Sequence, residues 1–507
     1  MNALRCHNRF LQILCLVLAG LFILSACGKE TPVDELTQPE ETTAATEVPA
    51  GAISAPYTLL DAMNPFYMET LVNASLISLL FDPLFTLDSG FMPVPLTATS
   101  SENNGTALTA QLEDSLVFSD ASPLTAADVV YSFEKAVGSP LYGESLKSIV
   151  SCAATGVSTV EFTLNSPDVN AVNLLTFPIV KAGTAETSTE VPIGAGRYVF
   201  VREDGRALLR ANLRYAGGVP KIGTVRLREI TESATLMHIL NVGGIDCFYT
   251  DLSDGVAKRS YAGSNEVYLN ELVFLGVNHM NGDLKNAEFR KAVSLSLSRS
   301  AIAANAFVSH ARAALTPFNT SWELLSSLPA AGSTEADPAA ADALLSRLGS
   351  GVGGVETRLT MLVSADADAF VKTAAGLIAE ELSYVNITLD VLYPNADLFK
   401  QMLREGKFDL YLGQIRLTKN MDLSPFFSEY GAARYGMDLD AMDLDETYFE
   451  YKSGGRELET FLNSFAELMP FIPLCYRNGQ FCYSRVIRSA IQSTEDRLFY
   501  NVEEWLV

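Results

Sequence analysis

The sequence predicts an α/β protein built as two lobes. Its 507 residues are enough for about three domains or for one large two-lobed unit. Hydrophobic residues make up 48% of the chain, so it can bury substantial cores and is not a disordered protein. Between residues 359 and 392 a strand, an amphipathic helix and a second strand follow one another, which is the pattern of a βαβ unit.

The βαβ unit is the clearest local signal. Either Asp366 or Asp368 can cap its helix, and the right-handed crossover rule makes its two strands parallel. A helix at 398–403 and a buried strand at 408–415 extend the unit. Lobes of this kind bind ligands beyond the carboxyl ends of their strands. That rule points to the segment 414–426.

The N-terminus predicts export. Arg5 and Arg9 precede an apolar run at 10–24, which is shorter than the roughly 20 residues that span a membrane and is typical of a signal peptide over residues 1–26. The stretch Leu24-Ser25-Ala26-Cys27 resembles a bacterial lipobox, which implies that Cys27 is lipidated and becomes the mature N-terminus. A plain membrane anchor is the alternative. Residues 27–52 are rich in Thr, Glu, Pro and Ala and predict a flexible tether.

Charge and metal-binding residue types exclude several functions. The net charge of −24 argues against a nucleic-acid partner and is weakly compatible with cationic ligands. No metal site or cofactor is expected, because His238, His279 and His310 are near neither one another nor a cysteine cluster. The remaining cysteines are expected to be buried free thiols, and a disulfide is the open alternative. They are Cys152, Cys247, Cys475 and Cys482.

The elements of the first half follow in order. A strand and turn from 53 lead to a helix through 71–79 and a hairpin at 88–90. Strands are expected at 108–117, 159–164, 197–202 and 225–230, and a helix at 232–241. Between the first two strands, Thr125 and Asp128 form the capping box of an amphipathic helix.

The second half begins with a buried strand at 272–278 and a helix at 289–307. The loop 314–322 carries Phe318 and Trp322, whose rings are either exposed for a ligand or buried as core plugs. A helix at 461–469 follows, and 486–507 returns to the first lobe.

Residues 118–136, FSDASPLTAADVVYSFEKA, resemble the block "F-x-D-G-x-P-L-T-A-x-D-V-x-x-S" of the extracellular solute-binding proteins of family 5, which serve peptide and nickel ABC importers. The match departs at Ala121, where that family usually has Gly. Residues 192–198 are similar to "P-x-G-T-G-P-Y", with Arg197 in place of Pro. Further family stretches follow in the expected order over nearly the whole mature chain.

The resemblance implies a two-lobed periplasmic-binding-protein-like fold of class II, cluster C type, with a small α+β insertion in lobe one. Lobe one then comprises 53–100, 190–272 and 476–507, the insertion 101–189, and lobe two 273–475. It also implies a set of ligand-binding residues: Asn64, Phe318, Trp322, Gln414, Arg416 and Asp422.

Two of these residues keep an alternative. In peptide-binding members an Asp near this position pairs the α-amine of the ligand, and Asp422 is the candidate. Arg416 and Asp422 are otherwise an exposed pair of little energetic value. If Arg416 and Asp422 bind the ligand, their alanine variants should lose affinity for the ligand without losing stability. For Asn64 the alternative is that it holds a structural turn.

By the same resemblance, the protein binds a small solute, first of all an oligopeptide, and delivers it to an ABC permease. Nickel chelates, other metal complexes and small sugars stay open, as does sensing without transport. A hydrolase is disfavoured, because the sequence has no G-x-S-x-G, H-E-x-x-H or Walker A motif and no catalytic residues are assigned. We expect a monomer at the outer face of the bacterial membrane, anchored through Cys27.

Overall fold

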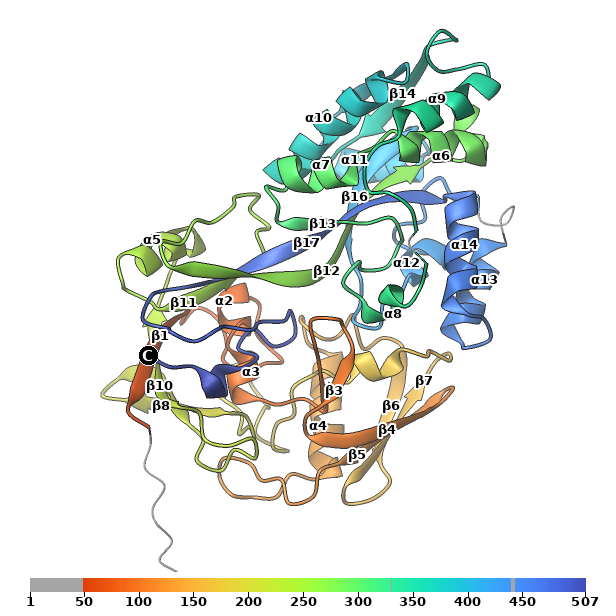
Figure 1. Ribbon diagram of the computed structural model, residues 1–507. Helices are drawn as coiled ribbons and strands as arrows, with labels where there is room; N and C mark the ends of the chain where they lie inside the picture. The colour runs from red at the N-terminus through yellow and green to blue at the C-terminus, as the bar shows by residue number, and fades with distance from the viewer. Residues whose placement is uncertain (1–48, 330, 439–442) are drawn as a thin grey trace, which may run out of the picture. The chain divides into compact units, whose positions relative to one another are not determined.

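A computed structural model describes residues 49–329, 331–438 and 443–507. The predicted signal peptide, Cys27 and most of the predicted tether lie outside the described residues. The described residues from 49 onward belong to one compact unit that mixes helices and strands (Figure 1). The α/β class predicted from the sequence is confirmed.

The first sheet contains the start of the described chain. Its order is β1-β10-β9-β8, in which β1 (Gly51–Tyr57) runs parallel to β10 (Ile222–Glu229). β9 (Arg206–Ala211) and β8 (Tyr198–Glu203) complete it as antiparallel neighbours. α2 (Leu71–Ala74) and α3 (Ile77–Leu80) contact this sheet, and η2 (Ser233–Thr235) and α5 (Leu236–Asn241) follow β10 in the chain.

The single helix predicted through 71–79 is wrong, because it divides into α2 and α3. The Ser75 hydroxyl donates to the carbonyl of Val72 at 2.7 Å. Such a bond between a serine side chain and the backbone competes with continued helix, so α2 ends there.

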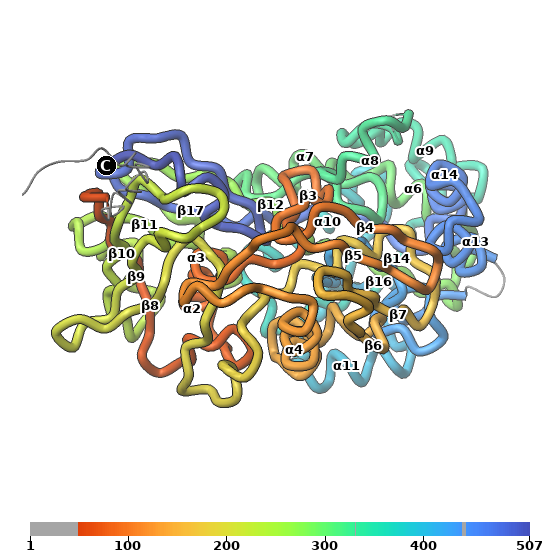
Figure 2. Tube along the Cα trace, turned by 90° about the horizontal axis from the view of Figure 1, so that it is seen from below, coloured from red at the N-terminus to blue at the C-terminus, as the bar shows by residue number. Residues whose placement is uncertain are grey.

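A separate antiparallel sheet forms the insertion. Its order is β4-β5-β7-β6, and α4 (Ala126–Val137) packs beside β6 and β7 (Figure 2). Phe133 of α4 meets Phe162 of β7 edge to face at 5.9 Å between ring centroids. A small hairpin, β2 (Phe85–Leu87) and β3 (Pro93–Pro95), precedes this sheet. The sheet strands are β4 (Ala98–Asn104), β5 (Ala107–Leu112), β6 (Ile149–Ala154) and β7 (Thr159–Leu164), with η1 (Ala171–Leu174) after them.

The start of α4 confirms the predicted capping box. The Thr125 N–H donates to Asp128 Oδ2 at 2.9 Å, and the Thr125 side chain accepts from the backbone at the same turn. The turn before it has Ala121 at φ +70°, a left-handed conformation that costs a residue with a Cβ about 1–2 kcal/mol. Family 5 usually has glycine at this position, and the strain gives the physical reason.

The largest sheet has the order β11-β17-β12-β16-β14-β15, and β13 pairs with β17. β14 (Thr357–Leu362) and β15 (Ile387–Leu392) are parallel and are joined by α10 (Ala369–Ser383), so the predicted βαβ unit is confirmed. Asp368 is the N-cap of α10, and its side chain accepts from the Val371 N–H. The other strands are β11 (Cys247–Thr250), β12 (Gly263–Val277), β13 (Ala311–Ala313), β16 (Leu410–Arg416) and β17 (Phe471–Tyr483).

The continuous helix predicted at 289–307 is wrong. α6 (Ala287–Leu295) ends, and the Ser298 side chain then caps a new turn, α7 (Arg299–Ala301), which passes into the π-helix η4 (Ile302–Ala306). The buried guanidinium of Arg299 donates to the Ser294 carbonyl at 2.8 Å, so the break satisfies carbonyls that a continuous helix would use. The remaining helices are η3 (Gly282–Lys285), α8 (Glu323–Ser326), α9 (Pro338–Arg347), α11 (Ala396–Arg404), α12 (Ser424–Phe427), α13 (Leu444–Lys452), α14 (Leu458–Leu468) and η5 (Val502–Glu504).

Two large hydrophobic cores meet along the long paired strands β12 and β17. On β12, Leu269 belongs to the first core and Leu272 to the second; on β17, Phe481 belongs to the first and Tyr476 to the second. The β12–β17 register also shifts between Tyr268 and Leu272. The chain therefore passes between the two cores on two adjacent strands. The exact lobe boundaries stay predictions.

Cys152, Cys247, Cys475 and Cys482 are free thiols, and all except Cys152 are buried. Burial raises the pKa of Cys482 to about 12 and that of Cys152 likewise, so both thiols are protonated at neutral pH. Among the helices of the described residues, none has the length and apolar character needed to cross a membrane.

Candidate functional site

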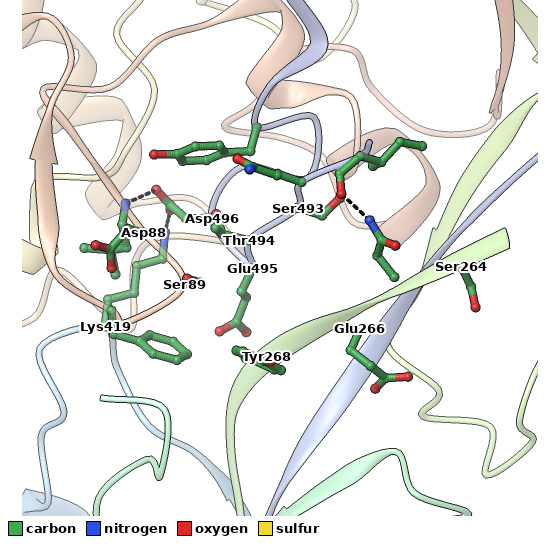
Figure 3. A pocket seen from close by; sticks show the side chains of 16 residues that line it. Asp88, Ser89, Ser264, Glu266, Tyr268, Lys419, Ser493, Thr494, Glu495 and Asp496 are labelled. Atoms are coloured by element: carbon green, nitrogen blue, oxygen red, sulfur yellow. Dashed lines mark hydrogen bonds and ion pairs between the residues drawn. The ribbon is translucent and has the colours of Figure 1, made fainter. Parts of the chain in front are cut away.

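A cavity of about 640 Å³ opens beside the loop that follows β16 (Figure 3). Its walls come from the β2–β3 hairpin at 87–91, the first half of β12 at 264–268 and the C-terminal segment at 491–500, together with Lys419. Small-molecule sites occupy about 300–1,000 Å³, so the cavity can enclose a small solute. It is therefore the candidate functional site.

The hairpin wall is held by Asp88. Its Oδ1 accepts hydrogen bonds from the backbone N–H groups of Gly90 at 2.8 Å and Met92 at 2.9 Å, which closes the turn between β2 and β3. The Phe91 carbonyl then accepts from the side-chain amide of Asn173 at 3.0 Å. These bonds tie the hairpin to the insertion and fix one wall of the cavity.

The β12 wall presents alternating side chains. Ser264, Glu266 and Tyr268 are two residues apart, so they share one side of the strand, as their labels in Figure 3 show. Glu266 Oε1 lies 2.8 Å from Nδ1 of His310, and the guanidinium of Arg312 lies 4.5 Å from the ring centroid of Tyr268. Two basic side chains thus position a carboxylate and an aromatic ring in this wall.

The C-terminal segment is anchored by Arg197, the residue that departs from the family pattern. Its guanidinium donates to the carbonyls of Phe499 at 2.9 Å and Tyr500 at 3.1 Å and pairs with Glu503. The Arg197 side chain is 1% exposed, so these bonds form in a buried setting. Arg197 therefore fixes the segment that carries Glu495 and Asp496.

Asp496 and Lys419 form an ion pair in the cavity (Figure 3). The Asp496 carboxylate is 5% exposed, and its Oδ2 also accepts from Thr86 Oγ1 at 3.0 Å and Leu87 N at 3.2 Å. The Lys419 ammonium donates to Thr176 Oγ1 at 2.8 Å. The pair joins the loop after β16 to the hairpin and the C-terminal segment.

Glu495 adds a second buried carboxylate to the same segment. It accepts from the Asn270 N–H at 3.0 Å and lies 3.8 Å from Arg416. Burial raises the pKa of Glu495, although the charge of Arg416 opposes the rise. With Asp88, Glu266 and Asp496, the cavity wall has four carboxylates against the ammonium of Lys419 and the guanidinium of Arg416 beside Glu495, which favours cationic groups.

None of the ligand-binding residues predicted from the sequence is part of the cavity wall. Asn64 is fully buried, its amide donates to the Thr187 carbonyl at 3.0 Å, and its oxygen accepts from Phe66 N at 3.2 Å. Asn64 therefore holds a turn, as in the structural alternative. A ligand contact of Asn64 stays a prediction.

The exposed position considered for Phe318 and Trp322 is wrong. Their side chains are 0% and 2% exposed, and their rings pack 5.2 Å apart in the second core. Aromatic rings of this size gain most by leaving water, and here the loop folds Phe318 against Tyr451 and Phe461. Of the two alternatives, the structure shows that both rings are buried in the core.

Gln414 and Arg416 lie at the end of β16. Gln414 Oε1 accepts from Arg477 at 3.3 Å, and Arg416 binds Glu271 at 3.0 Å. Arg416 also lies within 3.8 Å of Glu495, so it touches the cavity only through a carboxylate of the wall. A direct role of either residue in ligand binding stays a prediction.

Asp422 is committed to contacts within the protein. Its Oδ1 accepts from Lys452 at 2.9 Å, Tyr448 at 2.7 Å and the Ser424 hydroxyl at 2.6 Å. Burial would raise the pKa of Asp422, but the charge of Lys452 and these hydrogen bonds lower it below the usual value. The expectation that Asp422→Ala leaves stability unchanged is therefore replaced by an expected loss.

Sequence reasoning missed Lys419, Glu495 and Asp496. Lys419 lies inside the segment 414–426 to which the strand-end rule pointed, so position alone gave a signal for it. The C-terminal segment carried no motif or periodicity. Its only sequence signal was Arg197, a buried arginine at a position where family 5 has proline.

Metal ligands are not gathered at this site. Within the part of the chain that the structure describes, no three His, Cys, Asp or Glu side chains are grouped so that they could hold a metal ion. The cavity itself offers carboxylates, hydroxyls, two side-chain amides, three aromatic rings and one ammonium. This chemistry suits a polar organic solute with cationic groups.

Comparison with known families gives one match over most of the chain. The model described as bacterial extracellular solute-binding proteins, family 5 Middle, matches residues 92–436. The oligopeptide-binding protein AppA of Bacillus subtilis is 25% identical over 222 residues, which cover 39% of this chain. The chain matches 40% of the length of that relative.

Solved structures share the fold. The ABC transporter substrate-binding protein CtaP of Listeria monocytogenes superposes with a TM-score of 0.69 at 21% identity, over 90% of this chain and 99% of that one. NikA of Brucella suis, solved in complex with Fe(III)-EDTA, gives a TM-score of 0.68 at 17% identity over 89% and 99%. At such identities the likeness establishes a two-lobed binding-protein architecture and nothing about the ligand.

Proposed function

Because the chain belongs to the bacterial extracellular solute-binding proteins of family 5, we propose that it is the substrate-binding component of an ABC importer. It captures a small solute, first of all an oligopeptide, between two lobes and delivers it to a membrane permease. The observation that carries this proposal is the cavity of about 640 Å³, whose wall joins Lys419 to segments assigned to lobe one.

The chemistry of the cavity supports a peptide. Glu495 and Glu266 offer carboxylates to an ammonium group, and the partly exposed Lys419 offers an ammonium to a carboxylate. A peptide carries both groups and an amide backbone for the hydroxyls in the wall. The name of the Bacillus relative, an oligopeptide-binding protein, supports the same class of solute.

Closure of the lobes is supported by the two strands that pass between the cores. β12 and β17 lie side by side, so bending at their register shift near Tyr268 and Leu272 can move both connections together. Ligands of two-lobed binding proteins are enclosed by hinge motion of this kind. The permease would then recognise the closed form.

We place the protein outside the cytoplasm, in keeping with a family of extracellular proteins. The lipobox at Cys27 supports a lipid anchor at the outer face of the membrane, with residues 27–52 as tether and a monomeric body. A hydrolase has no support from the cavity, whose wall has no histidine to serve a nucleophile. Sensing without transport remains the alternative use of the same fold.

The test is native mass spectrometry followed by thermal unfolding. Every core residue lies between 53 and 505, so a chain that begins at residue 28 keeps both cores. A ligand at 100 times its Kd adds about 2.7 kcal/mol to the free energy of unfolding. We expect a co-purified peptide or a shift with a peptide pool. A shift with chelated metals alone would contradict the peptide assignment and keep solute binding, and no shift with either pool would favour another ligand class.

A further inference from the structure

A second, smaller cavity adjoins the Lys419–Asp496 pair. Its volume is about 190 Å³, and Lys419, Glu495 and Asp496 line it as well as the large cavity. The two cavities therefore share one short stretch of wall, in which the ion pair is the central feature (Figure 3 shows the side that faces the large cavity).

The smaller cavity has a different character from the large one. Its remaining wall comes from α2 and α3, from the turn after α4 and from the segment after η1. Apart from four serine and threonine hydroxyls, these side chains are apolar or aromatic: Ala74, Ile77, Phe81, Pro83, Leu141, Tyr142, Leu146, Leu174, Phe177, Pro178 and Leu498. Lobe one and its insertion thus build an apolar chamber beside a charged one.

The size of the chamber limits what it can hold. An apolar cavity of about 150 Å³ in another protein binds benzene. A chamber of about 190 Å³ therefore has room for one aromatic ring or one branched aliphatic chain. Transfer of such a group out of water into an apolar site is favourable without any directional contact.

We propose that the smaller cavity is the apolar compartment of the ligand site and takes one side chain of leucine to phenylalanine size. The peptide backbone passes the Lys419–Asp496 pair, which can hydrogen-bond its amide groups, and the charged end of the peptide lies in the large cavity. This inference rests on the proposed function, and it adds a preference for peptides with a bulky apolar residue.

The first test uses indole as the probe and does not depend on peptide binding. Ser145→Phe fills the compartment, because Ser145 lines it and its hydroxyl makes no hydrogen bond within the described residues. Ser151→Phe on β6 is the matched control, since Ser151 is exposed and outside the wall. We expect indole to raise the Tm saturably in the parent and in the control, and to bind Ser145→Phe about tenfold more weakly or worse.

The proposed apolar compartment would be contradicted if indole did not raise the Tm of the parent, or if it raised the Tm of Ser145→Phe equally. If Ser145→Phe does not fold, Ala74→Leu on the opposite wall serves in its place. Urea unfolding of each variant without indole checks that the parent fold is kept.

The second test compares two peptide pools of equal length and charge, one with Leu and Phe and one with only Ser and Gly. We expect the apolar pool to shift the Tm of the parent and of Ser151→Phe more strongly, and Ser145→Phe to lose this excess. Equal shifts by both pools would overturn the assignment of the compartment to the ligand site. Indole binding without any peptide shift would support the apolar compartment and count against the peptide function itself.

Discussion

Lys419 and Lys452 both pair with carboxylates, yet their surroundings differ. Lys452 is 9% exposed and lies 2.9 Å from Asp422 and 3.8 Å from Asp168 of the insertion. Lys419 is 25% exposed and pairs with Asp496 in the wall of the large cavity. The same ion-pair chemistry therefore serves a sealed contact in one place and the wall of a cavity in the other.

The hydrogen bonds around each pair explain the difference. Asp168 accepts from the Asn420 amide at 2.7 Å and from Asn170 N at 2.8 Å, so the Lys452 cluster is closed on the insertion side as well. Val169 N also donates to the Lys452 carbonyl at 2.9 Å. The Lys452 cluster is filled by contacts within the protein, whereas Lys419 lines both cavities.

The largest effect is expected for Asp422→Asn. It removes the carboxylate that pairs with Lys452 and leaves that ammonium largely buried, and breaking a buried pair costs about 3 kcal/mol. Urea unfolding at pH 7 measures the loss. Asp390→Asn, on the exposed side of β15, should change stability by less than about 0.5 kcal/mol. If Asp422→Asn lost as little stability as this control, Asp422 would not be held by a buried pair and would be free for a ligand.

The pH dependence sharpens the same comparison. The folded pKa of Asp422 is depressed, so its contribution is present above the unfolded pKa of about 3.9 and is lost as pH falls through the folded pKa. The stability difference between parent and Asp422→Asn should therefore shrink below about pH 4. Paired urea titrations from pH 7 to pH 3 measure it. A difference that grows on acidification would contradict the assignment.

Lys419→Met should have a smaller effect. The Asp496 carboxylate keeps its bonds from Thr86 and Leu87, and Lys419 is partly exposed, so we expect a loss of about 1 kcal/mol. Methionine keeps the length of the side chain and removes the charge. The same urea experiment applies. A loss of unfolding free energy as large as that of Asp422→Asn would mean that Lys419, like Lys452, serves mainly to hold the fold together.

The sequence predicted elements better than it predicted the site. The capping box of Thr125 and Asp128 and the βαβ unit with Asp368 as N-cap depend on nearby residues, so periodicity and capping rules identify them. The break at Ser298 was missed, because it depends on Arg299 reaching carbonyls far along the chain, such as that of Pro473 at 3.0 Å.

The site was missed for the same reason on a larger scale. Its wall brings together segments that are hundreds of residues apart, such as the hairpin at Asp88 and the C-terminal segment at Asp496, and no local pattern records that meeting. Asp422 was favoured because the family resemblance places an amine-binding Asp near this position, but a carboxylate of a buried structural pair can occupy the same position. Lys419, three residues earlier, has the position that the rule describes.

The smallest effect is expected for Arg416→Ala. The Arg416 side chain is 48% exposed, and an ion pair of that exposure, here with Glu271, contributes less than about 0.5 kcal/mol because water and salt screen it. Arg358→Ala, which breaks the exposed pair with Glu356, is the control with the same expected size. Urea unfolding in low and high salt measures both. A loss above 1 kcal/mol for Arg416 alone would show that its contact with Glu495 holds the cavity wall, and Arg416 would then belong with Lys452 on the structural side of the comparison.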